Sequence, residues 1–236
     1  MNILYTSHSA IPTYPPNITD YPDFYKCKEY LFILHPGDML YIPSNWFHWV
    51  FSYPDEKQNI AISYSVSNFS GTIYNEFQFK KPYKFHLDKT ELPFFNHTFD
   101  TFKNLYPNHK IKTLVSNKNI LVPVKKSSIK SHKLIKLSLT FNEMEQLMQK
   151  NTHNIYMGQN NSLQQYNPPE CLSRGFPNSK YTCNQWLALF KDNTEYIDSG
   201  LHYDRTHGIL IQIKGTKLVR LFKPQDYNNL YVQPMH

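Results

Sequence analysis

The chain has 236 residues but only three cysteines and seven glycines. Cys27, Cys171 and Cys183 are odd in number and follow no zinc-binding spacing, which is typical of reduced thiols in an intracellular protein, cytoplasmic or nuclear. No apolar run approaches the length of a membrane span, and the first residues lack the basic start and apolar stretch of a signal peptide. We therefore expect neither a disulfide-stapled secreted scaffold nor a membrane partner.

Acidic residues are missing from one long stretch. Between Thr101 and Asn142 there is no Asp or Glu but there are nine lysines, at positions 103, 110, 112, 118, 125, 126, 130, 133 and 136. The net charge is +7, so this stretch contributes +9 and the rest sums to −2. Such a segment could hold nucleic acid. Few aromatic residues interleave with the lysines to stack on bases, so a solvated, lysine-rich surface is the simpler interpretation.

Short apolar segments separated by turn residues fill the first third of the chain. Strands are predicted at residues 30–34, 39–42, 47–53 and 59–66. Strands this short and this closely joined are typical of an antiparallel sandwich or barrel. Residues 1–25 contain four prolines and predict a loop.

The middle of the chain gives weaker signals. Strands are predicted at 111–115 and 120–124, and a helix at 141–150, where a capping-box pattern precedes apolar residues at helical spacing. Residues 160–181 are rich in Asn, Pro and Ser and predict a long loop.

A His-x-Asp pair near the end of the chain is the first candidate for chemistry. His202 and Asp204 are two residues apart, so on a strand their side chains point to the same face. Such a pair can supply two ligands of a 2-His-1-carboxylate site, which suits non-heme Fe(II) and leaves positions open. In residues 208–222, apolar residues alternate with others on both sides of a Lys-Gly turn, and this pattern predicts a β-hairpin. His86 and Asp88 repeat the pair without such a segment, and we interpret them as exposed residues at a segment boundary.

Two longer motifs resemble those of a known family. Residues 37–48, GDMLYIPSNWFH, are similar to the distal histidine motif of the cupin-like Jumonji-C (JmjC) hydroxylases. Residues 199–204, SGLHYD, followed by QIKGTK at 212–217 and LFKPQD at 221–226, are similar to the proximal motif. The resemblance is greatest to the branch that includes the asparaginyl hydroxylase inhibiting hypoxia-inducible factor. It implies a mainly β fold, a double-stranded β-helix or jelly roll, with a small α+β segment inserted between the motif halves.

The resemblance also implies a metal site. His202, Asp204 and His48 match the family's Fe(II) ligands. Judged from the sequence around it alone, His48 would more often be a hydrogen-bonded core histidine than a ligand, and only the motif changes that expectation.

A co-substrate site follows from the same resemblance. Lys217 matches the lysine that pairs with the far carboxylate of 2-oxoglutarate, and Tyr156 and Ser199 match positions that hydrogen-bond this carboxylate. Relatives often carry asparagine near the co-substrate, where this chain has Gly208 and Ser65.

The two motifs occur in the opposite order from the family, which indicates a circular permutation. Residues 1–80 match the second half of the β-helix, 81–198 the family's N-terminal α/β segment, and 199–236 the first half, all expected to form one domain. The halves must pair within one chain or between two, so the protein is expected to be a monomer or a homodimer. Internal pairing requires the chain ends to lie on the same side of the barrel.

These observations predict an Fe(II)- and 2-oxoglutarate-dependent oxygenase that hydroxylates a protein or RNA substrate, tRNA included. The alternative is a non-catalytic cupin-like binding module, a decayed or incomplete copy. A nucleic-acid-binding protein is a third possibility that rests only on the lysines of 101–142.

Overall fold

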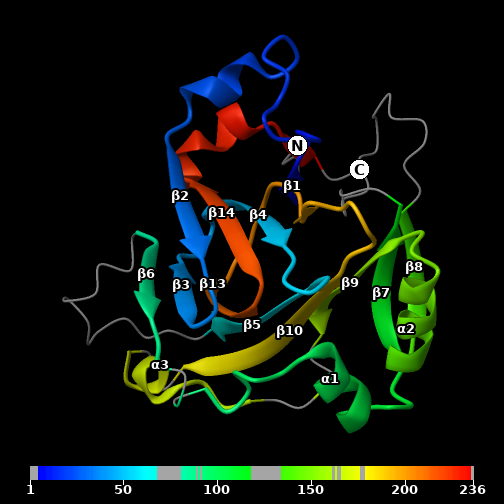
Figure 1. Cartoon of the computed structure of the whole chain (residues 1–236). Helices are drawn as coiled ribbons and strands as arrows, with labels where there is room; N and C mark the ends of the chain where they lie inside the picture. The colour runs from blue at the N-terminus through cyan, green and yellow to red at the C-terminus, as the bar shows by residue number, and fades with distance from the viewer. Residues whose placement is uncertain are drawn as a thin grey trace.

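The structure is a computed structural model that describes residues 5–67, 81–88, 90, 92–117, 134–160, 163, 166–175 and 179–234. In these residues, two antiparallel sheets face each other (Figure 1). The mainly β fold predicted from the sequence, a double-stranded β-helix with an α+β segment between the motif halves, is confirmed.

The larger sheet carries the middle of the chain and parts of both motif halves. Its strand order is β6-β3-β13-β5-β10-β9-β7-β8. The bounds are β6 Tyr83–His86, β3 Asp38–Ile42, β13 His207–Lys214, β5 Gln58–Ser67, β10 Lys180–Leu189, β9 Asn154–Asn160, β7 Ile111–Ser116 and β8 Leu134–Leu139.

The smaller sheet combines the two ends of the chain. Its order is β15-β1-β12-β4-β14-β2, with β11 also paired to β4. The bounds are β15 Val232–Pro234, β1 Tyr5–Ser9, β12 His202–Tyr203, β4 Phe47–Tyr53, β14 Thr216–Phe222, β2 Glu29–Leu34 and β11 Ile197–Asp198. Because β4 pairs with β12 and β14, and β13 with β3 and β5, the two motif segments pair within one chain.

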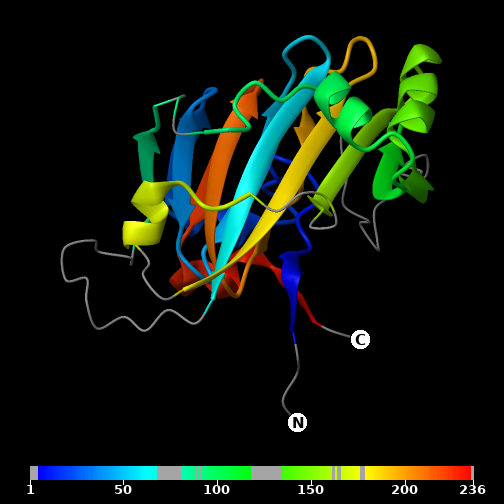
Figure 2. The same ribbon diagram turned by 90° about the horizontal axis from the view of Figure 1, so that it is seen from below.

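Helices cover the outer face of the larger sheet (Figure 2). They are α1 (Phe99–Leu105), α2 (Phe141–Gln149) and α3 (Glu170–Gly175). Phe102 of α1 and Phe141 of α2 stack with ring centroids 6.0 Å apart and belong to the same buried cluster as Ile60 and Ile62 of β5. The helix predicted at 141–150 is confirmed, including its capping box. None of the described helices is both long enough and apolar enough to cross a membrane.

The outer face of the smaller sheet is covered by segments from both chain ends. Two 3-10 helices, η1 (Pro22–Lys26) and η3 (Pro224–Leu230), place Phe24 and Leu230 against Trp49 and Phe222. The helices and chain ends thus cover the outer face of each sheet. The inner faces of the two sheets line the space between them, and the candidate site lies there.

The predicted hairpin at 208–222 is wrong. β13 and β14 follow each other through Gly215 but belong to different sheets, so the chain crosses from one layer to the other. Gly215 has φ +76°, and side-chain amides hold the turn: Asn59 donates to the Thr216 carbonyl at 3.0 Å, and Gln212 donates to the Lys214 carbonyl at 2.6 Å. Apolar residues alternate along a strand whether or not it pairs with the next strand of the chain, so the sequence pattern does not distinguish the two cases. The contact with Asn59, which is distant in sequence, is not visible in that pattern.

Two predicted loops contain regular structure. Residues 1–25 include β1 and part of η1, because β1 gains its partners from the far end of the chain. Residues 160–181 include α3. The four strands predicted between 30 and 66 and the one at 111–115 are present, whereas the strand predicted at 120–124 lies outside the described residues.

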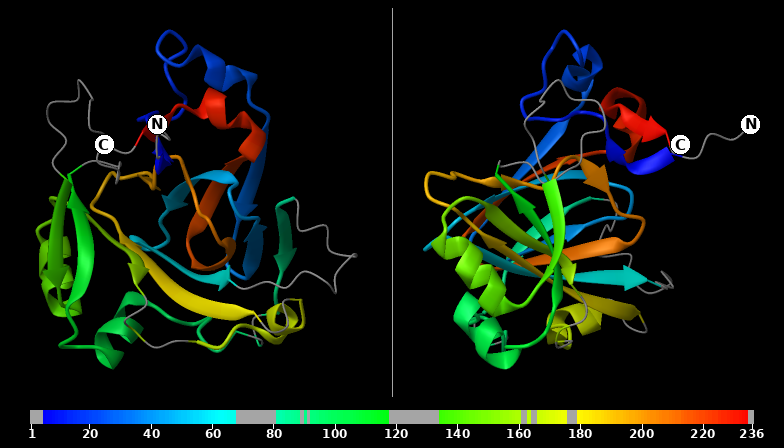
Figure 3. Two further views of the ribbon diagram at one scale, coloured as in Figure 1. Left: turned by 180° about the vertical axis from the view of Figure 1, so that it is seen from behind. Right: turned by 90° about the vertical axis from the view of Figure 1, so that its right-hand side faces the viewer.

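The two described ends of the chain lie side by side (Figure 3). β1 and β15 are antiparallel neighbours, and Tyr5 is opposite Pro234. The expected proximity therefore holds for the described ends, while Met1 and His236 themselves lie outside the described residues.

His86 and Asp88 do not form a second cluster of metal ligands with a third residue among the described residues. His86 is exposed, as expected, but its Nδ1 lies 3.0 Å from the carboxylate of Asp38, which also pairs with Lys84.

Candidate metal centre and adjoining cavity

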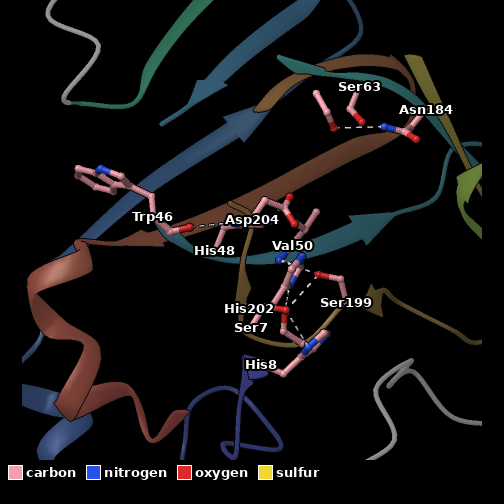
Figure 4. A network of polar contacts seen from close by, with 12 residues as sticks. Ser7, His8, Trp46, His48, Val50, Ser63, Asn184, Ser199, His202 and Asp204 are labelled. Carbon is pink, nitrogen blue, oxygen red and sulfur yellow. Dashed lines mark hydrogen bonds and ion pairs between the residues drawn. The ribbon is translucent and has the colours of Figure 1, made fainter. Parts of the chain in front are cut away.

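Three side chains meet between the sheets (Figure 4). His48 of β4 and His202 of β12 are directly opposite each other in the strand register, and Asp204 follows two residues later. One nitrogen of each histidine and one carboxylate oxygen all lie within 4.8 Å of one another. The structure thus brings together the three predicted ligands, from segments more than 150 residues apart.

Both histidines have a ring nitrogen free to bind a metal. Nδ1 of His48 lies 3.1 Å from the Trp46 carbonyl, and Nδ1 of His202 lies 3.0 Å from the Gly200 carbonyl. A carbonyl can only accept, so Nδ1 carries the proton in each ring. The lone pair is then on Nε2, and Nε2 of His48 is 3.7 Å from Asp204 Oδ2.

The electrostatics favour the neutral form of His202. Burial, and then the neighbouring His48, lower the pKa of His202 to about 4. Metal binding requires deprotonated ligands, so this histidine is ready to bind near neutral pH. Asp204 is about half exposed (49% of its side chain), so the cluster lies where the space between the sheets opens to solvent.

A small cavity continues inward from the cluster. Its volume is about 80 Å³, and it is lined by the three residues of the cluster together with Lys217, Tyr156 and Ser199. All six residues predicted for the site thus border one space.

Lys217 is the buried cation of this cavity. It lies on β14 with 3% of its surface exposed, and its ammonium group donates to the Ser52 hydroxyl at 2.6 Å. Burial lowers its pKa to about 7. By contrast, Lys214 forms an ion pair with Glu56 at the turn. Because Ser52 is a neutral partner, Lys217 remains able to attract a carboxylate that enters the cavity.

Tyr156 and Ser199 occupy different parts of the wall. Tyr156 of β9 is 9% exposed, and burial raises the pKa of its phenol. The Ser199 hydroxyl accepts a hydrogen bond from the Val50 backbone at 3.2 Å and lies 3.4 Å from the Gly200 carbonyl. Ser199 therefore also ties the loop before His202 to the strand of His48.

Gly208 and Ser65 line the cavity, as the family comparison led us to expect, and an asparagine from another strand joins them. Asn184 of β10 is opposite Ser63 in the register, and its amide donates to the Ser65 hydroxyl at 3.4 Å. Asn184 belongs to neither motif: it lies in residues 183–190, over which the resemblance to the family extends only weakly, so no role was predicted for it.

A larger groove opens outward from the same cluster. Its volume is about 940 Å³, and it shares Tyr156, Trp186, Ser199, His202 and Asp204 with the inner cavity. Its far wall is the β7–β8 pair, where Leu114 is opposite Lys136 on one strand and opposite Tyr156 on the other. Residues paired in this way lie on one face of a sheet. Two of the nine lysines counted above, Lys112 and Lys136, line this groove.

His8 is a second residue that sequence reasoning missed. It is opposite His202 in the register of β1 and β12, and the two rings stack with centroids 5.5 Å apart. Burial lowers the pKa of His8, with a further contribution from His202. No local motif marks this residue, since β1 is recognised only through its pairing.

Two facing antiparallel sheets with a His-His-Asp cluster between them define a cupin-type protein with a candidate metal centre. A family model described as a cupin-like domain matches residues 4–69 and 91–236, and the chain belongs to this family.

Two curated relatives are similar to this chain. A JmjC domain-containing protein of Acanthamoeba polyphaga mimivirus is 26% identical over 258 aligned residues, which cover 91% of this chain and 37% of the viral protein. The tRNA wybutosine-synthesizing protein 5 of Danio rerio is 52% identical over 33 residues, 14% of this chain and 10% of that protein. The chain thus spans well under half the length of either relative. No solved structure gives a significant match.

Proposed function

We propose that the chain is an Fe(II)- and 2-oxoglutarate-dependent oxygenase that hydroxylates a protein or RNA substrate. The observation that carries this proposal is the donor set: one nitrogen from each of two imidazoles and one carboxylate oxygen, all within 4.8 Å. Two histidines and one carboxylate with open positions suit non-heme Fe(II). When bound, iron would activate O₂ as the oxidant, and 2-oxoglutarate would donate two electrons on decarboxylation to succinate and CO₂, so that one oxygen atom enters succinate and the other a C–H bond of the substrate.

The protein's own residues hold and orient these groups. In this proposal His48, His202 and Asp204 bind the metal, and the carbonyls of Trp46 and Gly200 keep both rings in the required tautomer. Lys217 anchors the far carboxylate of the co-substrate, assisted by Tyr156 and Ser199. Apolar side chains such as Ile42, Val50 and Leu210 line the inner cavity and would shield the bound co-substrate on that side.

Decarboxylation of 2-oxoglutarate tests the proposal. The purified chain is incubated with Fe(II), ascorbate and 2-oxoglutarate, and succinate is measured with and without a candidate substrate. We expect production of succinate that is abolished by His48→Ala and by Asp204→Ala. His86→Ala is the matched control, because it removes an exposed histidine outside the cluster.

The alternative is a non-catalytic cupin-like module. It predicts that the chain binds metal, with or without 2-oxoglutarate, but forms no succinate under any of these conditions. Absence of metal binding in the unmodified chain would contradict the oxygenase proposal altogether.

The lysines and aromatic rings of the outer groove favour RNA, which is negatively charged, over an uncharged substrate. Lys112 and Lys136 lie on the wall opposite the cluster, and Tyr156 and Trp186 add aromatic surface. Lysines attract phosphates, and aromatic rings stack on bases. One curated relative has a name that places it in tRNA modification.

A binding measurement tests this substrate class. With a fluorescent single-stranded RNA at low salt, Lys112→Glu combined with Lys136→Glu should weaken binding by about tenfold or more and reduce its salt dependence. Lys150→Glu combined with Lys180→Glu makes the same charge change outside the groove and is the control. Equal effects of the two pairs would argue against RNA in the groove.

A further inference from the structure

Asp198 is a buried carboxylate close to the metal cluster. It has no role in the reaction proposed above. It ends β11, is 2% exposed and is opposite Phe51 of β4. Burial raises its pKa to about 7. A buried carboxyl group is costly unless its oxygens are hydrogen-bonded, so its partners indicate its role.

One oxygen of Asp198 accepts two hydrogen bonds. The indole N–H of Trp49 donates to Oδ1, and the backbone N–H of Gly200 donates to the same atom at 2.6 Å. These two donors lie on different parts of the fold: Trp49 on β4, Gly200 in the loop that precedes β12.

Each donor is adjacent to one of the histidines. Trp49 directly follows His48, and the Gly200 carbonyl holds Nδ1 of His202 at 3.0 Å. Asp198 therefore connects the strand that carries one candidate ligand to the peptide that orients the other.

Gly200 makes this connection sensitive to loss of the carboxylate. Its φ of +75° lies in the left-handed region, where glycine is the least restricted residue. The Gly200 N–H and the Gly200 carbonyl belong to successive peptide units, which only the torsions of this glycine connect. Without the bond from the N–H to Asp198, these torsions are less restricted, and the Gly200 carbonyl can turn away from the His202 ring. Ser199, which bonds Val50 through both its backbone and its hydroxyl, holds the other side of the Ser199–Gly200 peptide.

We propose that Asp198 is a positioning residue of the metal centre: it holds the loop before β12 against β4 and so keeps His202 in the tautomer with a free Nε2. This inference rests on the proposed function only in assuming that the cluster binds a divalent metal. Outer partners of this kind commonly change metal affinity by about 10–100-fold when they are removed.

The test measures metal affinity and histidine tautomer, not turnover. Mn(II) binding is measured by calorimetry for the unmodified chain, Asp198→Ala and Asp198→Asn. We expect Asp198→Ala to weaken binding by about 10–100-fold. Asp198→Asn should recover most of this loss, because an amide oxygen can accept the same two N–H bonds. In the metal-free protein, nitrogen NMR shifts should show Nδ1-protonated His202 in the unmodified chain and a mixture of tautomers in Asp198→Ala.

Asp38→Ala is the matched control. Asp38 is also a buried carboxylate with several partners, but these are the His35 backbone, Lys84 and His86. It should lower stability and leave Mn(II) affinity within about twofold of the unmodified chain.

The outcomes separate the two proposals. If the unmodified chain binds no divalent metal, the proposed function fails. If it binds metal, and a folded Asp198→Ala keeps the same affinity and the same His202 tautomer, only the role of Asp198 is overturned. If Asp198→Ala does not fold, Trp49→Phe decides: it removes one donor, and unchanged affinity and tautomer in this variant would also overturn the role.

Discussion

Lys217 shows how burial can tune a single residue for binding. Among the described residues, the hydrogen-bond partner of its ammonium group is a neutral hydroxyl, that of Ser52, and burial lowers its pKa to about 7. A dicarboxylate in the cavity would restore a charged partner and raise this pKa. The same residue therefore links ligand binding to proton uptake.

This linkage predicts a pH dependence for 2-oxoglutarate binding. Below a pH of about 7, Lys217 is already protonated in the free protein, so its contribution to affinity is constant. Above that pH, binding must take up a proton, and the affinity should fall by up to about tenfold per pH unit. Calorimetry between about pH 6 and 9 in two buffers of different ionisation enthalpy measures both the affinity and the proton uptake.

Two variants control for other titrating groups. Lys217→Met should bind 2-oxoglutarate weakly and without this pH dependence, while its Mn(II) affinity stays near that of the unmodified chain. Lys214→Met removes a lysine that pairs with Glu56 outside the cavity and should behave like the unmodified chain. A flat affinity up to pH 9 in the unmodified chain would contradict the lowered pKa of Lys217, and an unchanged affinity in Lys217→Met would show that Lys217 does not bind the carboxylate.

At the same scale, the sequence revealed the residues that lie within motifs and missed those that do not. His48, His202 and Asp204 were predicted because their motifs have fixed spacing, and they meet in the structure. Asp198 and His8 could not be found in this way. Their positions depend on pairing with β4 and β12, and these contacts span many residues of sequence.

At the scale of elements, the crossing between β13 and β14 positions the cavity. β13 contributes Gly208 and Leu210 to one wall, and β14 contributes Lys217 to the other. The strand segments themselves were predictable, because their apolar residues alternate. Their sheet assignment was not, because the turn between them is held in part by Asn59, which is distant in sequence.

Gly215 should therefore be intolerant of any side chain. A Cβ atom there would lie 2.6 Å from the Tyr53 carbonyl oxygen, and the backbone φ of +76° is unfavourable for other residues. We expect Gly215→Ala to lower the free energy of unfolding by about 1–3 kcal/mol, measured by urea denaturation.

Gly208→Ala is the matched control for this change. A Cβ atom at position 208 would meet nothing closer than 3.8 Å, at Ile42, and its backbone needs no left-handed conformation. Its effect on stability should be within about 1 kcal/mol. Similar losses for both variants would mean that the crossing turn has no special requirement for glycine.

At the scale of the whole molecule, the order of the motifs requires the two ends of the chain to lie close together. The smaller sheet includes β15 and β1 as neighbours, so the last described strand continues the sheet into the first. Circular permutation, predicted from the motif order, remains a proposal that explains this arrangement. The sequence indicated that the ends should meet, but the strand β1 itself was hidden in a proline-rich segment.

Joining the ends tests this arrangement directly. Directly opposite residues in an antiparallel pair have Cα atoms about 4.5–5.5 Å apart, and Tyr5 is opposite Pro234. The six residues beyond these positions, 1–4 and 235–236, can span about 20 Å, so a head-to-tail peptide bond should close without strain. Cyclisation restricts the unfolded chain, so we expect a higher melting temperature with Mn(II) affinity unchanged. The linear chain carrying the same ligation sequences is the control. A cyclic protein that is less stable than this control, or that loses metal binding, would show that the ends must separate for the native sheet to form.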